Sequence, residues 1–127
     1  QAELSRVMNE TAHYTKGTLT LALSYGGRAE ITDAVKAIAR KVKAGTLSPS
    51  SISEDTIREH LYAPDIPAQD FMIRTSGAMR ISNFLLWQIS YAELYVTPVL
   101  WPDFREKELA EALENYQQRH RRFGDIK

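Results

Sequence analysis

The sequence predicts an α/β fold, a mostly parallel sheet with packed helices. Three runs have the length and composition of strands, namely residues 18–24, 70–74 and 92–96. Between and around them lie segments with apolar residues at helical spacing, over 2–13, 29–44, 53–62 and 104–121. Strands that alternate with helices favour parallel pairing over a meander of hairpins.

The composition is that of one globular domain with no net charge. The chain has 127 residues, 43% of them hydrophobic and 25% charged, and its 16 basic residues balance its 16 acidic ones. This balance argues against nucleic acid as a partner. No apolar stretch approaches the roughly 20 residues of a membrane span, no signal peptide is visible, and there is no cysteine. We therefore expect a cytoplasmic protein.

The first part of the chain is expected to form a helix followed by a strand. Residues 2–13 carry apolar side chains at helical spacing, and Gly17 follows as a breaker. Residues 18–24 alternate small or hydroxyl side chains with leucines, which predicts a strand with one leucine face. The chain begins at Gln1 on what looks like the inside of a helix, and we expect it to be a fragment.

Two helices follow. The turn Tyr25–Arg28 contains two adjacent glycines, which by themselves indicate only a tight bend. The helix over 29–44 has one apolar face and a basic C-terminal end, and Gly45 is a natural stop. Ser53 has the residue type of an N-cap for the next helix, to about Tyr62.

The central stretch, from Asp70 to Phe104, carries the chemistry. A short apolar strand ends in Arg74, and Arg80 and Ser82 follow in one loop. Guanidinium groups, hydroxyls and a glycine at a strand end suit an oxyanion, most plausibly a phosphate. The apolar segment 83–88 is expected to be helical, with its first amides facing the same anion. The same composition also suits a solvated turn.

The last third adds an acidic residue and a basic tail. Residues 91–96 form the expected second strand, where Glu93 is either an edge charge facing water or part of a site. Asp103 with Glu106 fits a capping box for the helix over 104–121. The basic run over 119–122 suits a helix C-terminus, an anion or a membrane surface.

The pattern RTSGxxRxSNFLLWQxxYxEL, followed by WPDF, resembles the C-terminal signature of the cis-prenyltransferase family, whose usual bacterial member is undecaprenyl diphosphate synthase. The resemblance runs from about Gly17 through SYGGR at 24–28 to RRFG at 121–124. It implies that residues 1–127 are the C-terminal part of a single domain whose N-terminal half is absent. The family's catalytic aspartate would then lie upstream, with no catalytic residue in this chain, and the fragment alone should be inactive.

The resemblance also implies an activity and a set of site residues. The family catalyses isoprenoid chain elongation, the consecutive cis-condensation of isopentenyl diphosphate onto an allylic diphosphate such as farnesyl diphosphate, here to undecaprenyl diphosphate for the cell-wall lipid carrier. The cofactor is Mg²⁺, which Glu93 would help to bind. The residues implied to hold isopentenyl diphosphate are Arg74, Arg80, Ser82, Arg122 and Gly124.

The implied partners are the two diphosphate substrates, a second copy in a homodimer centred on residues 82–100, and the membrane, which the protein would contact peripherally through its lipid product. An alternative is a non-catalytic partner subunit of a heteromeric cis-prenyltransferase. The retention of Arg74, Ser76, Arg80, Ser82 and Glu93 together argues against that alternative. One departure is Ala78, where most members carry glutamate.

Overall fold

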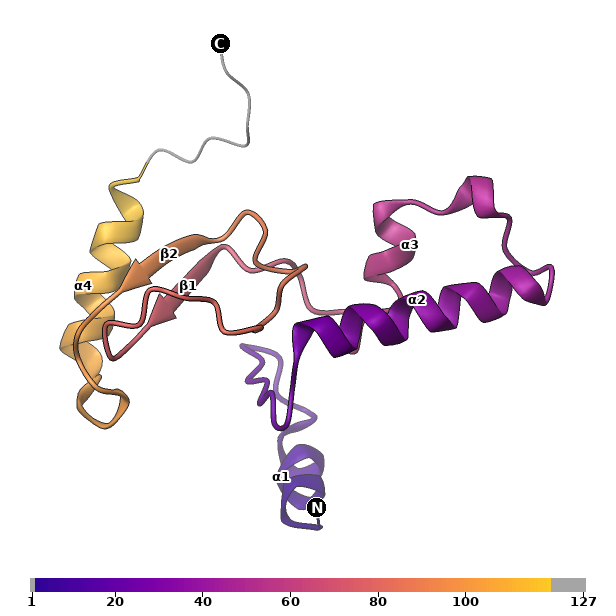
Figure 1. The fold of residues 1–127 in the computed structure, drawn as a ribbon. Helices are drawn as coiled ribbons and strands as arrows, with labels where there is room; N and C mark the ends of the chain where they lie inside the picture. The colour runs from indigo at the N-terminus through magenta and orange to yellow at the C-terminus, as the bar shows by residue number, and fades with distance from the viewer. Residues whose placement is uncertain (1, 120–127) are drawn as a thin grey trace.

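A computed structural model describes residues 2–119. Its helices and strands, drawn in Figure 1, are α1 (Ala2–Thr11), α2 (Gly27–Lys43), α3 (Glu54–Arg58), β1 (Phe71–Arg74), β2 (Glu93–Val96) and α4 (Glu106–Gln117), with 3-10 turns η1 (Pro49–Ser51) and η2 (Trp101–Asp103). Within residues 2–119, no helix is long and apolar enough to cross a bilayer.

Strands β1 and β2 form a parallel pair, as the sequence predicts for residues 70–74 and 92–96. Phe71 lies opposite Glu93, and Arg74 lies opposite Val96. Helix α4 packs against this pair (Figure 1), with Ala112 fully buried. The rings of Phe71 and Tyr116 lie 4.8 Å apart between the strand and the helix. The helix-on-sheet layer follows directly from the apolar patterns of both elements.

Helices α2 and α3 pack together on the other side of the molecule (Figure 1). Ala34 and Ile38 of α2 are buried, and α2 ends before Gly45, whose φ of 72° is left-handed. The predicted N-cap of α3 is confirmed, because Ser53 Oγ accepts the Thr56 N–H at 3.2 Å. Helix α3 ends at Arg58, short of the predicted Tyr62.

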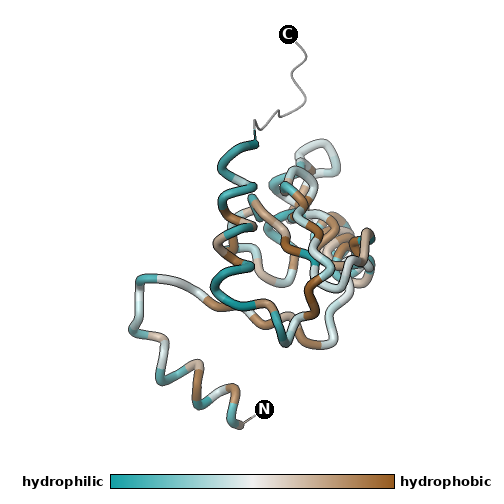
Figure 2. The backbone as a smooth tube through the Cα atoms, turned by 90° about the vertical axis from the view of Figure 1, so that its left-hand side faces the viewer, coloured by the Kyte–Doolittle hydropathy of each residue, from teal (hydrophilic) through white to brown (hydrophobic). Residues whose placement is uncertain are grey.

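The predicted strand over 18–24 is wrong for this structure. The segment has no regular structure, and Leu19, Leu21 and Leu23 are 86%, 61% and 65% exposed. A strand needs a hydrogen-bonded neighbour, and the sheet of the described residues contains only β1 and β2. The backbone tube of Figure 2 shows this part of the chain lying away from the main body together with α1.

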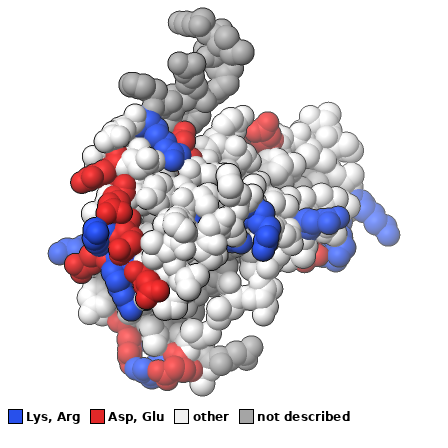
Figure 3. Space-filling model, turned by 60° about the vertical axis from the view of Figure 1, so that its left-hand side comes forward, with Lys and Arg blue, Asp and Glu red and all other residues white. Residues whose placement is uncertain are grey.

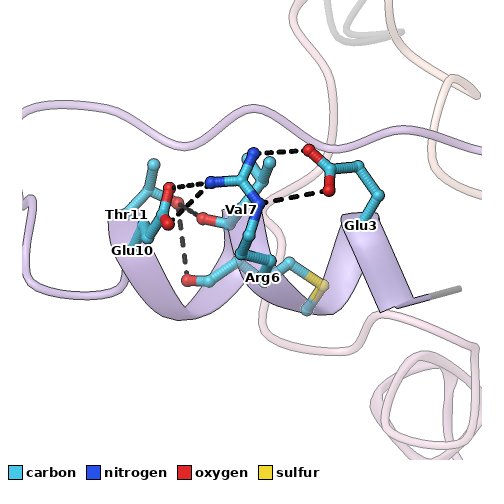
Figure 4. Close-up of polar contacts among 6 residues, drawn as sticks. Glu3, Arg6, Val7, Glu10 and Thr11 are labelled. Atoms are coloured by element: carbon cyan, nitrogen blue, oxygen red, sulfur yellow. Dashed lines mark hydrogen bonds and ion pairs between the residues drawn. The ribbon is translucent and has the colours of Figure 1, made fainter.

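Helix α1 has no buried residue, and ion pairs connect side chains along its surface. Arg6 lies between two carboxylates, and its guanidinium donates to Glu3 on one side and to Glu10 Oε1 at 2.7 Å on the other (Figure 4). Because these i,i+3 and i,i+4 pairs are exposed to solvent, they stabilise the helix only weakly. The helix predicted over 2–13 is therefore present, but nothing in the described part of the chain covers its apolar side.

Two further expectations need correction. Residues 83–88 are not helical, because Ser82, Asn83 and Leu85 have left-handed φ values of 54°, 63° and 45° that break a right-handed helical ladder. Helix α4 is not capped by the pair Asp103 and Glu106. Instead the Arg105 N–H donates to Glu108 Oε2 at 2.8 Å, and Asp103 belongs to η2.

Candidate anion-binding site

The guanidinium of Arg74 is the centre of the candidate site. It stands at the C-terminal end of β1, where its Nη2 donates to Ser82 Oγ at 3.1 Å. Its Nε is buried and has no hydrogen-bond partner among the described residues. Buried polar groups in folded proteins nearly always have a partner. The structure thus brings Arg74 and Ser82 together and leaves the buried Nε–H of Arg74 without a partner among residues 2–119.

The loop after β1 is hydrogen-bonded to the loop after β2. The Ser76 N–H donates to Val99 O and the Gly77 N–H to Thr97 O, both at 2.8 Å. Thr97 is buried, and its own N–H donates to Arg74 O at 2.9 Å. Arg80, the second guanidinium, is exposed at the far end of this loop. The backbone beside Arg74 is therefore fixed, whereas Arg80 is free to reach a ligand.

Left-handed backbone gathers around this loop. Ser76, Ser82, Asn83 and Leu85 all have positive φ, as does Gly77 at 66°. Outside glycine and asparagine such conformations cost about 1–3 kcal/mol each and persist only where the surroundings hold them. Concentrated backbone strain of this kind is typical of ligand sites.

Part of that support comes from the N-terminus of α2. The Gly27 N–H donates to Asn83 O at 2.8 Å and the Arg28 N–H to Asn83 Oδ1 at 2.9 Å. Asn83 thereby caps a helix 55 positions away, while the local N-cap residue Gly26 makes no side-chain cap bond. A Cβ on Gly27 would come within 2.9 Å of Leu86 Cγ, so glycine permits this close approach. The prediction of helical amides from 83–88 facing an anion is thus wrong.

A buried carboxylate that the sequence analysis did not single out is Glu30, in the first turn of α2. It is 1% exposed and accepts hydrogen bonds from the Tyr25 hydroxyl, from the Tyr62 N–H at 3.0 Å and from Gln88 Nε2 at 3.0 and 3.2 Å. Burial, and then the bond to Glu30, raise the pKa of Tyr25 above its usual value. In the sequence Glu30 looks like an ordinary helix N-terminal acid, and no local signal marks it.

Glu93 lies away from Arg74. It pairs with Phe71 at the start of the parallel register, whereas Arg74 stands at its end, so the two residues are separated by three residue steps, about 10 Å along the strands. Arg119 Nη1 lies 2.8 Å from Glu93 Oε2 and 2.9 Å from Leu94 O. Residues 2–119 contain no group of three or more acidic, histidine or cysteine side chains that could hold a metal ion.

The remaining two predicted residues, Arg122 and Gly124, lie outside the described residues. The charge distribution over one face is shown in Figure 3, where acidic and basic side chains mix along one side and the centre of the face carries few charges. The presence of both signs of charge on this face agrees with the neutral composition of the chain.

Known proteins match this chain over nearly its whole length. A family model described as "Putative undecaprenyl diphosphate synthase" matches residues 1–124. An isoprenyl transferase of Heliobacterium mobile is 50% identical over 98% of this chain, which covers 48% of that relative. A ditrans,polycis-undecaprenyl-diphosphate synthase of Haemophilus influenzae, named as specific for (2E,6E)-farnesyl diphosphate, is 51% identical over 98% of this chain and 52% of its own length.

A solved structure with the same fold is lavandulyl diphosphate synthase from Lavandula x intermedia, in complex with dimethylallyl diphosphate. It aligns with a TM-score of 0.93 at 39% identity, covering 98% of this chain and 54% of that chain. The chain therefore spans about half the length of the curated relatives it matches.

Proposed function

The chain belongs to the undecaprenyl diphosphate synthase family, and on this premise we propose that the whole protein is a prenyltransferase. It extends an allylic diphosphate, such as farnesyl diphosphate, by consecutive cis-condensation with isopentenyl diphosphate. The product is undecaprenyl diphosphate, the lipid carrier precursor of cell-wall synthesis. Residues 1–127 contribute the isopentenyl diphosphate site and are inactive alone.

The observation that carries the proposal is the buried Nε of Arg74, which has no partner within residues 2–119, beside the Arg74–Ser82 hydrogen bond. A diphosphate oxygen would accept the hydrogen bond that Nε can donate. Charge-assisted bonds to phosphate are about twice as strong as neutral ones. Exposed Arg80 would close over the same anion from the loop end. Arg122 and Gly124 complete the proposed set of residues on the C-terminal side.

Mg²⁺ is proposed as the cofactor, with Glu93 as the ligand from this chain. A protein commonly holds Mg²⁺ through one or two carboxylates together with substrate phosphates, so the chemistry of Glu93 fits. When bound, the ion would neutralise the leaving diphosphate. The ion pair with Arg119 is what the metal would have to displace.

We propose a homodimer because one chain separates its own Arg74 and Glu93 along the sheet. A two-fold axis through residues 82–100 would bring Glu93 and the C-terminal tail of one copy toward the diphosphates of the other. The protein would work in the cytoplasm and touch the inner face of the membrane through its growing lipid product.

The test is product analysis with the whole protein, isopentenyl diphosphate, (2E,6E)-farnesyl diphosphate and Mg²⁺. We expect a long polyprenyl diphosphate with cis double bonds, and no product from residues 1–127 alone. A folded whole protein that binds isopentenyl diphosphate but extends no allylic starter would contradict the proposal. If it instead stimulates a second, catalytic subunit, the alternative of a non-catalytic partner is correct.

A further inference from the structure

The segment over 82–88 is held against α2 at both of its ends. At one end Asn83 accepts the N–H groups of Gly27 and Arg28. At the other end Gln88 Nε2 donates to both carboxylate oxygens of Glu30. Between these two attachments lies Leu85, and it shares with Ser82 and Asn83 a left-handed backbone conformation that a free segment would not keep. The N-terminal turn of α2 thus acts as the support on which this segment is shaped.

Burying the carboxylate of Glu30 at this position costs desolvation free energy. A carboxylate that is 1% exposed loses nearly all of its hydration, which only hydrogen bonds or an opposite charge can replace. Its partners are donors without charge, namely the Tyr25 hydroxyl, the Tyr62 N–H and the Gln88 amide. An apolar side chain would fill the space without that desolvation cost. Three donors from three separate segments indicate that the carboxylate fixes geometry.

The segment that Glu30 holds in place contributes a hydroxyl group to the anion site. Gln88 and Asn83 set the path of the segment that begins at Ser82, and Ser82 Oγ is the acceptor for Arg74 Nη2. A shift of this segment would move the hydroxyl away from the guanidinium and change where the unpartnered Nε of Arg74 points. Misplacement of a binding group by about 1 Å can cost two orders of magnitude in function.

We propose that Glu30 is a positioning residue of the anion site, acting through Gln88 on the segment that carries Ser82. This inference rests on the proposed function, because it assigns a role toward the same diphosphate. It adds a residue outside the loop after β1, in the first turn of a helix, to the set that determines affinity for isopentenyl diphosphate.

The experiment measures binding of isopentenyl diphosphate and of inorganic pyrophosphate to the whole protein by calorimetry. Glu30→Gln replaces one acceptor oxygen by a donor that faces the existing donors, and we expect it to weaken both affinities about tenfold or more. Gln88→Ala removes the link from the other side. If Glu30 acts through Gln88, Glu30→Gln will have a much smaller effect in the Gln88→Ala background than in the wild type.

Two variants separate positioning from loss of stability. Ile38→Ala removes a buried side chain two turns further along α2, so it lowers the melting temperature without touching the segment. We expect it to leave both affinities unchanged. The exchange Glu30→Gln with Gln88→Glu restores a donor facing an acceptor, and we expect it to recover part of the lost affinity even if the single variants fold poorly.

The outcomes distinguish the two proposals. If the wild type binds both probes and folded Glu30→Gln binds them equally well, the positioning role is wrong and the proposed function stands. An effect of Ile38→Ala as large as that of Glu30→Gln at equal loss of stability would also overturn the positioning role. If the wild type binds neither probe, the anion site of the proposed function has failed.

Discussion

The guanidinium of Arg119 holds the carboxylate of Glu93, with Nη1 2.8 Å from Oε2 and both side chains just under one-third exposed. Asn115 Oδ1 fixes the other side of Arg119, at 2.7 and 3.0 Å. The start of β2 and the residue two positions after α4 are thereby joined by a charge pair. Any cation that binds Glu93 Oε2 must compete with this guanidinium.

The first prediction concerns that competition in the whole protein. Replacing Arg119 by glutamine removes a positive charge within hydrogen-bond distance of the proposed ligand, so we expect Arg119→Gln to tighten Mg²⁺ binding severalfold. Glu93→Gln should weaken it. Magnesium titration in the presence of pyrophosphate measures both. Weaker Mg²⁺ binding by Arg119→Gln would mean that the arginine prepares the carboxylate instead of blocking it.

Arg74→Ala should weaken isopentenyl diphosphate binding far more than starter binding. Hydrogen bonds to charged groups contribute about 1.5–3 kcal/mol, which corresponds to a loss of roughly 10- to 150-fold. Separate titrations with isopentenyl diphosphate and farnesyl diphosphate make the comparison. Arg40→Ala is the matched control, because Arg40 is an exposed arginine in the last turn of α2 and should change neither affinity. Equal losses for both ligands would contradict the assignment of Arg74.

The strands and the long helices were predictable because their signals are local. The apolar run before Arg74 and the helical spacing of α2 and α4 need only a few neighbouring residues to be read. The segment over 18–24 has the alternation of a strand, but pairing depends on a neighbour elsewhere in the chain, and the described residues supply none.

The errors near the site have the same origin. Residues 84–87 are apolar, and residues 83–88 contain no glycine or proline, so a helix is the reasonable local expectation. Contacts 55 and 58 positions away, from Arg28 to Asn83 and from Gln88 to Glu30, impose another conformation. Such contacts leave no periodic trace in the sequence, and the paired glycines at 26 and 27 indicate only a tight bend there.

Gly27→Ala should destabilise the protein and weaken the anion site together. The added Cβ would lie 2.9 Å from Leu86 Cγ and 3.2 Å from Asn83 O, so the segment must move away from α2. Overpacking of this kind costs about 1–3 kcal/mol. Gly17→Ala is the control, since a Cβ there meets nothing within 4 Å. Denaturant unfolding and pyrophosphate titration of both variants test it, and wild-type behaviour of Gly27→Ala would contradict the close contact.

Tyr25 should contribute a pH dependence at alkaline pH. Because burial and the Glu30 hydrogen bond raise the pKa of its hydroxyl, the folded state favours the protonated form. Its stabilising contribution is complete below the ordinary tyrosine pKa of about 10 and is lost as the pH rises through the raised value. Denaturant unfolding at several alkaline pH values should therefore show a smaller decline for Tyr25→Phe than for the wild type. Parallel curves would mean that this hydroxyl titrates normally.

The last prediction is the dimer. The four apolar residues at 84–87 lie within the predicted interface region and are half-buried, so they leave little apolar surface for a second copy. The same region nevertheless leaves other large apolar side chains in solvent, with Leu94 46% and Leu100 57% exposed. Leu94 lies on β2, directly beside Glu93. A second copy seated on this surface would bury these side chains and bring its own residues close to Glu93.

Light scattering on the whole protein at micromolar concentration should give the mass of a dimer. Leu94→Glu should shift it to a monomer, because a carboxylate would be buried without a partner at the interface. Leu113→Glu is the control, a similarly exposed leucine on α4 outside residues 82–100. The Leu94→Glu monomer should remain folded and lose product formation, since one chain keeps Arg74 and Glu93 about 10 Å apart along the strands. A fully active monomer would show that the site is complete within one chain.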